Sequence, residues 1–155
     1  MKGNDRVLTL LNDMLADELT AINQYMVHSE MCDNWHYARL HKAVEERAIV
    51  EMRHAEKLIG RLLFLEGIPV VSALKKINIG ADVVAQIKND LSAEWGAVKN
   101  YNEVIRVCVE VGDNGTRELL EAILTDEEDH VDWLEAQRDQ IDQMGIQNYL
   151  VEQVD

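Results

Sequence analysis

The chain has 155 residues, with 15 Lys or Arg against 29 Asp or Glu, so its formal net charge is −14. This acidity disfavours binding to nucleic acid or to an anionic membrane surface, because both require a basic protein face. It favours the attraction of small cations instead. The length is typical of one domain, so residues 1–155 are expected to form a single folded unit.

The chain also lacks the marks of export or membrane insertion. It contains no apolar run of about 18 residues that could cross a bilayer. Residues 1–6 do not begin an apolar signal-peptide region. Cys32 and Cys108 form neither a CxxC motif nor a disulfide framework. Together these features predict a cytoplasmic protein.

Apolar residues at helical spacing predict two helices in the first half of the chain. The first begins at the N-cap candidate Asn4-Asp5 and runs to a short break at residues 33–36. The second carries its apolar stripe over residues 40–65 and is stopped by the Gly and Pro at residues 67–69.

The second half of the chain repeats this pattern after residues 67–81, which have no helical period. Asp82 is the N-cap candidate of a third helix, whose apolar stripe covers residues 84–108. The later elements are a turn at residues 112–115, a fourth helix with its stripe over residues 120–141, a stop at Gly145, and a short helix within residues 147–154. No segment alternates polar and apolar residues, so no sheet is expected.

The predicted fold is therefore all-α. Four helices of nearly 30 residues would each be about 45 Å long at ~1.5 Å per residue, and long amphipathic helices of matched length pack as a four-helix bundle. The tight turns make two antiparallel hairpins, whereas residues 67–81 can span ~50 Å when extended. That segment can return the chain to the starting end of the bundle. One long crossover of this kind, with a short C-terminal helix, is the ferritin-like arrangement.

A glutamate interrupts the apolar face of every predicted long helix near its middle. The four are Glu18, Glu51, Glu94 and Glu127. Two of them are followed at i+3 by a histidine, His54 and His130 respectively. Residues three apart are neighbours on a helix surface, so each Glu-x-x-His can offer an oxygen and a nitrogen to one centre.

The chain also repeats internally. The first two of these glutamates are 33 residues apart, as are the last two, and an offset of 76 residues superposes the two halves. The same offset places Tyr25 on Tyr101 and His54 on His130. The repeat predicts a pseudo-twofold pair of helical hairpins that together supply four carboxylates and two imidazoles.

Four buried carboxylates need counter-charge, because each uncompensated buried ion costs about several kcal/mol. Two divalent cations would balance them, and carboxylate-rich ligation with one imidazole per metal suits iron or manganese better than structural zinc. A single glutamate on an apolar stripe is more often half of a salt bridge or a misplaced helix boundary. Agreement of six residues in type, face, spacing and repeat favours a two-metal site. His28, His36 and His41 lack this context and are expected at the surface or at an interface.

Several stretches closely resemble bacterioferritin, and the match covers essentially the whole chain. The matching motifs include Glu18-Leu19-x-Ala21-Ile22-Asn23-Gln24-Tyr25, Glu51-Met52-x-His54-Ala55, Leu63-Phe64-Leu65-Glu66-Gly67 and Asp126-Glu127-Glu128-x-His130. Bacterioferritins are haem-containing iron-storage proteins that assemble as hollow cages of 24 subunits built from twofold dimers. The resemblance implies that Glu51 and Glu127 bridge two irons per subunit. It also implies that Glu18 with His54, and Glu94 with His130, complete one iron each.

Met52 takes a different role in the resemblance. From the residues alone, it is an apolar side chain at an interface, because it faces sideways when Glu51 faces the bundle interior. In the family, the matching methionines of two subunits hold one haem b across a dimer twofold axis. The resemblance therefore implies that Met52 is an axial haem ligand.

Two positions depart from the family pattern. Many bacterioferritins have a histidine and an aspartate where this chain has Glu46 and Val50. Those residues are associated with iron on the inner surface, near the di-iron centre. Val50 cannot bind metal, so little ordered iron is expected there, although Glu46 offers one carboxylate.

The expected function combines an enzyme with a store. Fe(II) would be oxidised by dioxygen or hydrogen peroxide at the six-residue site, and the ferric product would collect as mineral inside the cage. Haem would serve electron transfer in iron release, with a ferredoxin as a candidate partner. Two alternatives stay open: a stand-alone di-metal oxidase or peroxidase without storage, and a structural helical module that needs no iron. The mass of the oligomer separates storage from the first, and metal analysis separates it from the second.

Overall fold

The computed structural model describes all 155 residues, and it is helical except for its turns and one long connection. The elements in chain order are α1 (Asp5–Asn34), α2 (Ala38–Phe64), α3 (Val83–Val111), α4 (Asn114–Met144) and the short α5 (Ile146–Val151). Their number and order confirm the prediction. No helix is apolar over a stretch long enough to cross a membrane.

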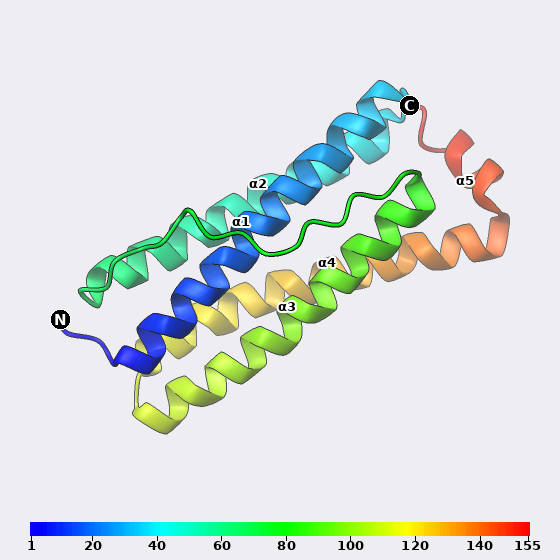
Figure 1. Ribbon diagram of the computed structural model, residues 1–155. Helices are drawn as coiled ribbons and strands as arrows, with labels where there is room; N and C mark the ends of the chain where they lie inside the picture. The colour runs from blue at the N-terminus through cyan, green and yellow to red at the C-terminus, as the bar shows by residue number, and fades with distance from the viewer.

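The helices form two antiparallel hairpins, α1 with α2 and α3 with α4 (Figure 1). The crossover, residues 65–82, runs the length of the bundle beside α1 and α3 and leads from the end of α2 to the start of α3. Helices α2 and α3 are therefore parallel, as the length of the crossover predicts. This is the ferritin-like four-helix bundle with one long crossover and a short C-terminal helix.

Side-chain caps fix where α1 and α3 begin. Asn4 Oδ1 accepts hydrogen bonds from the backbone amides of Arg6 and Val7, at 2.9 and 3.4 Å. Asp82 Oδ1 accepts one from the amide of Ala85 at 2.8 Å. Both caps satisfy amides that have no partner within the helix, which confirms the two predicted N-caps.

Some boundaries differ from the prediction by a few residues. The connection between α3 and α4 contains only Gly112 and Asp113, because the Asp113 carboxylate caps the Thr116 amide and lets Asn114 and Gly115 join α4. Gly112 has a φ of +74°, a left-handed conformation that suits glycine after a helix.

Two further helix ends lie elsewhere than predicted. Helix α2 ends at Phe64, before the stop at residues 67–69, and Glu66 takes a φ of +61°. Helix α5 covers Ile146–Val151, so it starts one residue earlier and ends three residues earlier than the predicted segment. At the start of α3, Val83 is buried and Val84 is exposed, so the predicted stripe is displaced by one residue there.

Two apolar clusters fill the ends of the bundle. The larger one lies near the N-terminus of α1 and contains Val7, Leu11, Met14, Leu15, Ala55, Leu58, Leu62, Leu65, Tyr101, Val104, Val107, Cys108, Leu120 and Ile123. The smaller one lies near α5 and contains Cys32, Leu40, Val83, Ile87, Leu134 and Tyr149. Both cysteines are buried and unpaired within these clusters. The level between the two clusters is where the four predicted glutamates lie.

Side chains of α1 hold the backbone of the crossover along the bundle. Four of them accept hydrogen bonds of 2.8–3.1 Å from crossover amides: Asn12 from Val70, Thr20 from Lys75, Gln24 from Asn78, and His28 from Gly80. The crossover therefore has a defined path despite having no secondary structure of its own.

His28 corrects one prediction. Its side chain is fully buried, with Nδ1 2.9 Å from Asp90 Oδ1 and Nε2 accepting the Gly80 amide. The His28 side chain therefore links α1 to α3 and to the crossover inside the subunit. The expectation of a surface or interface histidine is wrong. His36 is exposed, as expected, and His41 is partly buried against Ser29.

Candidate metal centre

The predicted site residues meet at the middle of the bundle, between the two apolar clusters. One glutamate comes from each long helix and both histidines come from the Glu-x-x-His segments of α2 and α4. All six side chains are buried: Glu18, Glu51, His54, Glu94, Glu127 and His130. The helical period places each glutamate on the inward stripe, so the apolar pattern and the polar centre share one face of every helix.

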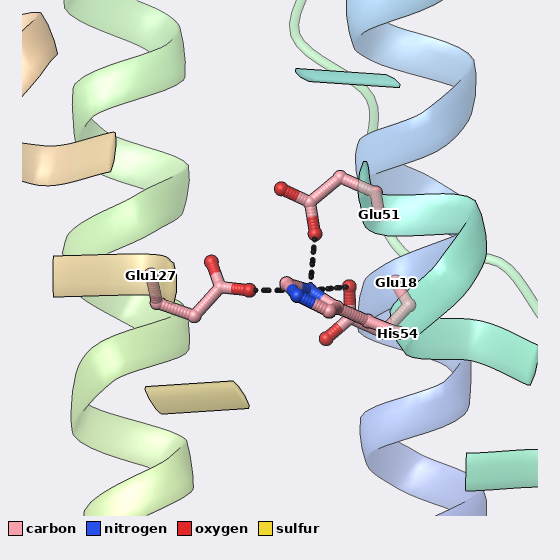
Figure 2. Close-up of side chains that lie close together, drawn as sticks. All are labelled: Glu18, Glu51, His54 and Glu127. Carbon is pink, nitrogen blue, oxygen red and sulfur yellow. Dashed lines mark hydrogen bonds and ion pairs between the residues drawn. The ribbon is translucent and has the colours of Figure 1, made fainter. Parts of the chain in front are cut away.

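The first group of candidate ligands surrounds His54 (Figure 2). Its Nδ1 atom lies 2.9 Å from Glu127 Oε1, 3.2 Å from Glu51 Oε2 and 3.7 Å from Glu18 Oε2. Burial disfavours the charged imidazole, but the contacts with Glu127, Glu18 and Glu51 outweigh it and raise the pKa of His54 to about 12. Three helices thus direct oxygen atoms at one ring nitrogen.

The second group consists of Glu51, Glu94 and His130. One ligand atom from each lies within 4.8 Å of the others, and the same holds for the first group. His130 Nδ1 is 2.8 Å from Glu94 Oε1, and its ring stacks on Trp133 with centroids 6.0 Å apart. Glu51 belongs to both groups, which is the geometry of a carboxylate shared between two neighbouring positions.

The donor atoms of the centre fit metal ions better than they fit one another. Glu51 Oε1, Glu94 Oε2, Glu127 Oε1 and His130 Nδ1 are buried without a well-aligned hydrogen bond. Buried polar atoms in this state are uncommon and mark a site that takes an ion or a water. Carboxylate oxygens with one imidazole nitrogen per position suit iron or manganese.

Crowding of the carboxylates perturbs their protonation. Burial, and then repulsion from Glu18, raises the pKa of Glu51 to about 8. Burial, and then the hydrogen bond with Glu94, raises the pKa of Glu127 to about 9. Burial acts on Glu94 too, but contacts with Glu127 and His130 outweigh it and hold its pKa below the usual range. Burial and crowding therefore favour protonation of Glu51 and Glu127 in the absence of metal, and binding of a cation would oppose it.

Two tyrosines cross the centre to hold opposite carboxylates. Tyr25 of α1 donates its hydroxyl to Glu94 of α3, and Tyr101 of α3 donates its hydroxyl to Glu18 of α1. Burial and repulsion from nearby carboxylates raise the pKa of both phenols well above the usual value, so both keep their protons. The 76-residue repeat superposes these tyrosines. In the structure they play equivalent roles, because each donates a hydrogen bond to a glutamate of the other hairpin.

Asp126 is a contributor that the sequence interpretation missed. Its Oδ2 is 3.0 Å from His54 Nε2, on the side of the ring that faces away from the glutamates. A carboxylate at this position fixes the ring orientation and leaves Nδ1 free to bind a metal. The repeat makes Val50 its counterpart, and Val50 lines the same cavity as His130. His130 Nε2 has no hydrogen-bond partner in the protein.

Arg47 is the second missed contributor, and it lies inside the centre. Its guanidinium forms ion pairs with Glu51, with Glu127 at 3.0 Å and with Glu94 at 3.6 Å. Arg47 and Glu51 are four residues apart on α2, so the shared helix face is a signal from which this contact could have been predicted.

A polar cavity of about 500 Å³ links the centre to the outer surface beneath the crossover. The four glutamates line its inner end. Lys75 of the crossover lies at its outer end and pairs with Asp13 and Asp17 of α1, at 3.0 and 2.6 Å. Only 4 of its 19 lining residues are hydrophobic, so the cavity is a polar space that joins the four glutamates to Lys75.

The remaining predicted residues lie outside the centre. The side chain of Met52 is 46% exposed on the outer face of α2, as its position beside the inward Glu51 predicts. Glu46 is exposed and lies 3.9 Å from Lys42. Binding of haem or iron by these residues stays a prediction.

Comparison with known proteins agrees with this architecture. A family model described as a ferritin-like domain matches residues 8–144. The chain is 42% identical to a bacterioferritin of Rhodobacter capsulatus and 40% identical to one of Brucella melitensis, in each case over 96% of this chain and 92% of the relative. It is 40% identical to a bacterioferritin of Mycobacterium avium, over 96% of this chain and 94% of that protein. The chain therefore belongs to the bacterioferritin family.

Proposed function

We propose that this chain is an iron-storage subunit with ferroxidase activity, an Fe(II):oxygen oxidoreductase that works within one bundle of residues 1–155. The observation that carries the proposal is the pair of ligand groups that share Glu51 at the buried centre. Glu18, Glu51, His54, Glu94, Glu127 and His130 would hold two irons per subunit. Glu51 belongs to both ligand groups and Glu127 contacts His54, and we propose that these two glutamates are the shared ligands.

Fe(II) is the substrate, and the cavity beneath the crossover gives it a polar route to the centre. Each of two Fe(II) ions gives up one electron, and together they reduce dioxygen to hydrogen peroxide or hydrogen peroxide to water. The protein holds the ligand side chains in place before the substrates bind. Tyr25 and Tyr101 orient Glu94 and Glu18, and Asp126 orients His54.

Storage requires a closed cage in addition to the oxidation site. Family membership supports a homo-oligomeric cage, for which we propose 24 copies of this chain. We expect light scattering to give a mass near that of a 24-mer, and the purified oligomer to retain many more ferric ions than two per subunit. A monomer or dimer that oxidises Fe(II) without retaining it would identify the stand-alone oxidase instead.

Haem is the second proposed cofactor, one haem b for each pair of subunits. Met52 is a suitable ligand because its thioether is exposed, and Ile49, one turn earlier on α2, adds exposed apolar surface beside it. Bound there, haem would supply electrons for the release of stored iron, with a ferredoxin as the proposed donor. One residue from each of two copies can meet only across an isologous interface.

The haem proposal has a direct spectroscopic test. Met52→Leu keeps the side-chain volume and removes the sulfur, so we expect the cage to assemble without haem and to oxidise Fe(II) at the normal rate. Met26→Leu, at another exposed methionine of the subunit, is the matched control and should retain haem. An unchanged bis-methionine absorption spectrum in Met52→Leu would exclude Met52 as the ligand.

A further inference from the structure

Arg47 contacts the two halves of the metal centre unequally. Its ion-pair partners are Glu51, Glu94 and Glu127, so it contacts every carboxylate of the Glu94–His130 half. It makes no ion pair with Glu18, which belongs to the other half. The guanidinium thus contacts Glu94, which belongs to the second position alone, and the two carboxylates proposed as shared, but not Glu18, which belongs to the first position alone.

The placement of Arg47 is specific. Its side chain is only 11% exposed, and its Nη1 donates a further hydrogen bond of 3.1 Å to the backbone oxygen of Asp126. A buried guanidinium loses hydration that its partners must replace, and here three carboxylates and one carbonyl replace it. Arg47 is therefore the only arginine or lysine side chain that supplies counter-charge to the four glutamates.

The charge balance changes when metal binds. Two divalent ions already neutralise four carboxylates, so a guanidinium at hydrogen-bond distance would then be a surplus positive charge beside a cation. One divalent ion together with the guanidinium offsets three of the four carboxylates. Arg47 is thus compatible with one bound metal and is repelled by the second.

We propose, on the basis of the function proposed above, that Arg47 is a displaceable counter-cation that makes the two metal positions fill in order. The Glu18–His54 position fills first, because its own carboxylate Glu18 is free of Arg47 and the guanidinium can keep its contact with Glu94. The Glu94–His130 position fills second and more weakly, because its metal must also displace the guanidinium from Glu94.

The structure contains a place for the displaced side chain. A cavity of about 410 Å³ between α2 and α4 is lined by Arg47 itself, by two carboxylates, Asp126 and Asp129, and by two further cations, Arg53 and Lys57. Asp129 is exposed and forms no ion pair, so its carboxylate is free to receive the guanidinium. Rotation of the Arg47 side chain about its own bonds would move its charge from the centre into this cavity without a change in α2.

The test is a titration of the metal-stripped cage with Zn²⁺, a divalent ion that undergoes no redox reaction. For the native chain, calorimetry should resolve two steps per subunit whose dissociation constants differ by at least ~10-fold, the size expected for one buried charge pair. Anomalous scattering from crystals soaked with one equivalent should place that first zinc beside Glu18 and His54.

Arg47→Gln removes the charge and should bring the two dissociation constants within ~3-fold of each other, mainly by strengthening the second step. It should also lower the melting temperature of the metal-free cage relative to that of the native cage. Two equivalents of Zn²⁺ should remove this difference in melting temperature. Arg47→Lys keeps the charge and should keep the two steps apart. Arg39→Gln, at an exposed arginine of the same helix that forms no ion pair and lies outside the cavity, is the control and should behave as the native chain.

The inference is overturned if the native chain binds two zinc ions with equal affinity, or if the first zinc lies beside Glu94 and His130. It is also overturned if Arg47→Gln leaves the separation of the two steps unchanged. If Arg47→Gln does not fold, the native titration and Arg47→Lys still decide. A native cage that binds no zinc at the centre would instead refute the di-metal function on which the inference rests.

Discussion

The two halves of the metal centre share a repeat but differ in what surrounds their ligands. In the first half, Asp126 holds His54 from behind at 3.0 Å, and the ring is fully buried. In the second half, the residue equivalent to Asp126 is Val50, and His130 Nε2 has no hydrogen-bond partner. Arg47 contacts Glu94, the carboxylate that belongs to the second half alone, but not Glu18, its counterpart in the first half.

The difference shows which residues stay equivalent in a duplicated fold: the candidate metal ligands do, and the residues that support them do not. The ligands lie on the inward stripes of the helices, where the helical period and the packing leave little freedom. The supporting residues surround the ligands. Their neighbours differ between the two hairpins, so the supporting residues can differ as well. Two positions with matching ligands can therefore differ in metal affinity, because the supporting residues tune ligand basicity and orientation.

Removal of a shared ligand should abolish the distinction between the halves and have the largest effect. We expect Glu127→Ala to leave the cage assembled and to slow dioxygen-dependent oxidation of Fe(II) by at least ~10-fold, because both positions lose a ligand. Stopped-flow absorbance measures the initial rate. Glu128→Ala changes the exposed neighbour and should keep the native rate, whereas a native rate in Glu127→Ala would contradict the ligand assignment.

Removal of the supporting carboxylate should mainly affect the first half. Asp126→Asn keeps the shape of the side chain but weakens its hold on His54, so the tighter of two Zn²⁺ steps should weaken by about 10-fold. Calorimetry on the metal-stripped cage measures each step. Glu128→Gln on the same helix is the control, and a loss confined to the weaker step would reverse the assignment of the halves.

Adding the missing carboxylate should make the halves more alike. Val50→Asp provides the counterpart of Asp126 beside His130, and we expect a few-fold tighter second Zn²⁺ step even in the Arg47→Gln background. With Glu46→His added, the later phase of iron uptake should speed up while the initial oxidation keeps its rate. Native crystals soaked in iron should show little ordered metal at Glu46, and a well-occupied ion there would contradict this account.

The smallest expected effect is a pH dependence of the metal-free cage. Glu51 and Glu127 have folded-state pKa values of about 8 and about 9, above the ordinary 4.5. Their protons therefore stabilise the fold fully below about pH 4.5, and that contribution is lost as the pH rises towards 9. We expect calorimetric melting temperatures to fall by a few degrees over this range. The melting temperature of zinc-loaded cages should not fall over this range. An equal fall with zinc bound would show that it does not arise from Glu51 and Glu127.

The sequence predicted the fold and the six candidate ligands because both depend on periodicity within single helices. The apolar stripes located the helices, and the interruptions of those stripes located the glutamates. The two missed contributors were harder to find, because Asp126 and Arg47 act across helices. The repeat and the i,i+4 spacing of Arg47 and Glu51 were usable signals. His28 could not be placed without the path of the crossover, which no periodic pattern describes.

The hydrogen bonds between α1 and the crossover have a consequence for how much length variation this segment tolerates. The acceptors on α1 lie at multiples of four residues, at positions 12, 20, 24 and 28, so they form a ladder with nearly one rung per helical turn. An extended chain advances more than twice as far per residue as a helix, about 3.3 against 1.5 Å. The crossover uses three residues for the step from Thr20 to Gln24 but only two for the equal step from Gln24 to His28, so its backbone is less extended in the first interval. Loss of one residue between Lys75 and Asn78 would therefore be absorbed by local extension, whereas loss of one between Asn78 and Gly80 would break a hydrogen bond to α1.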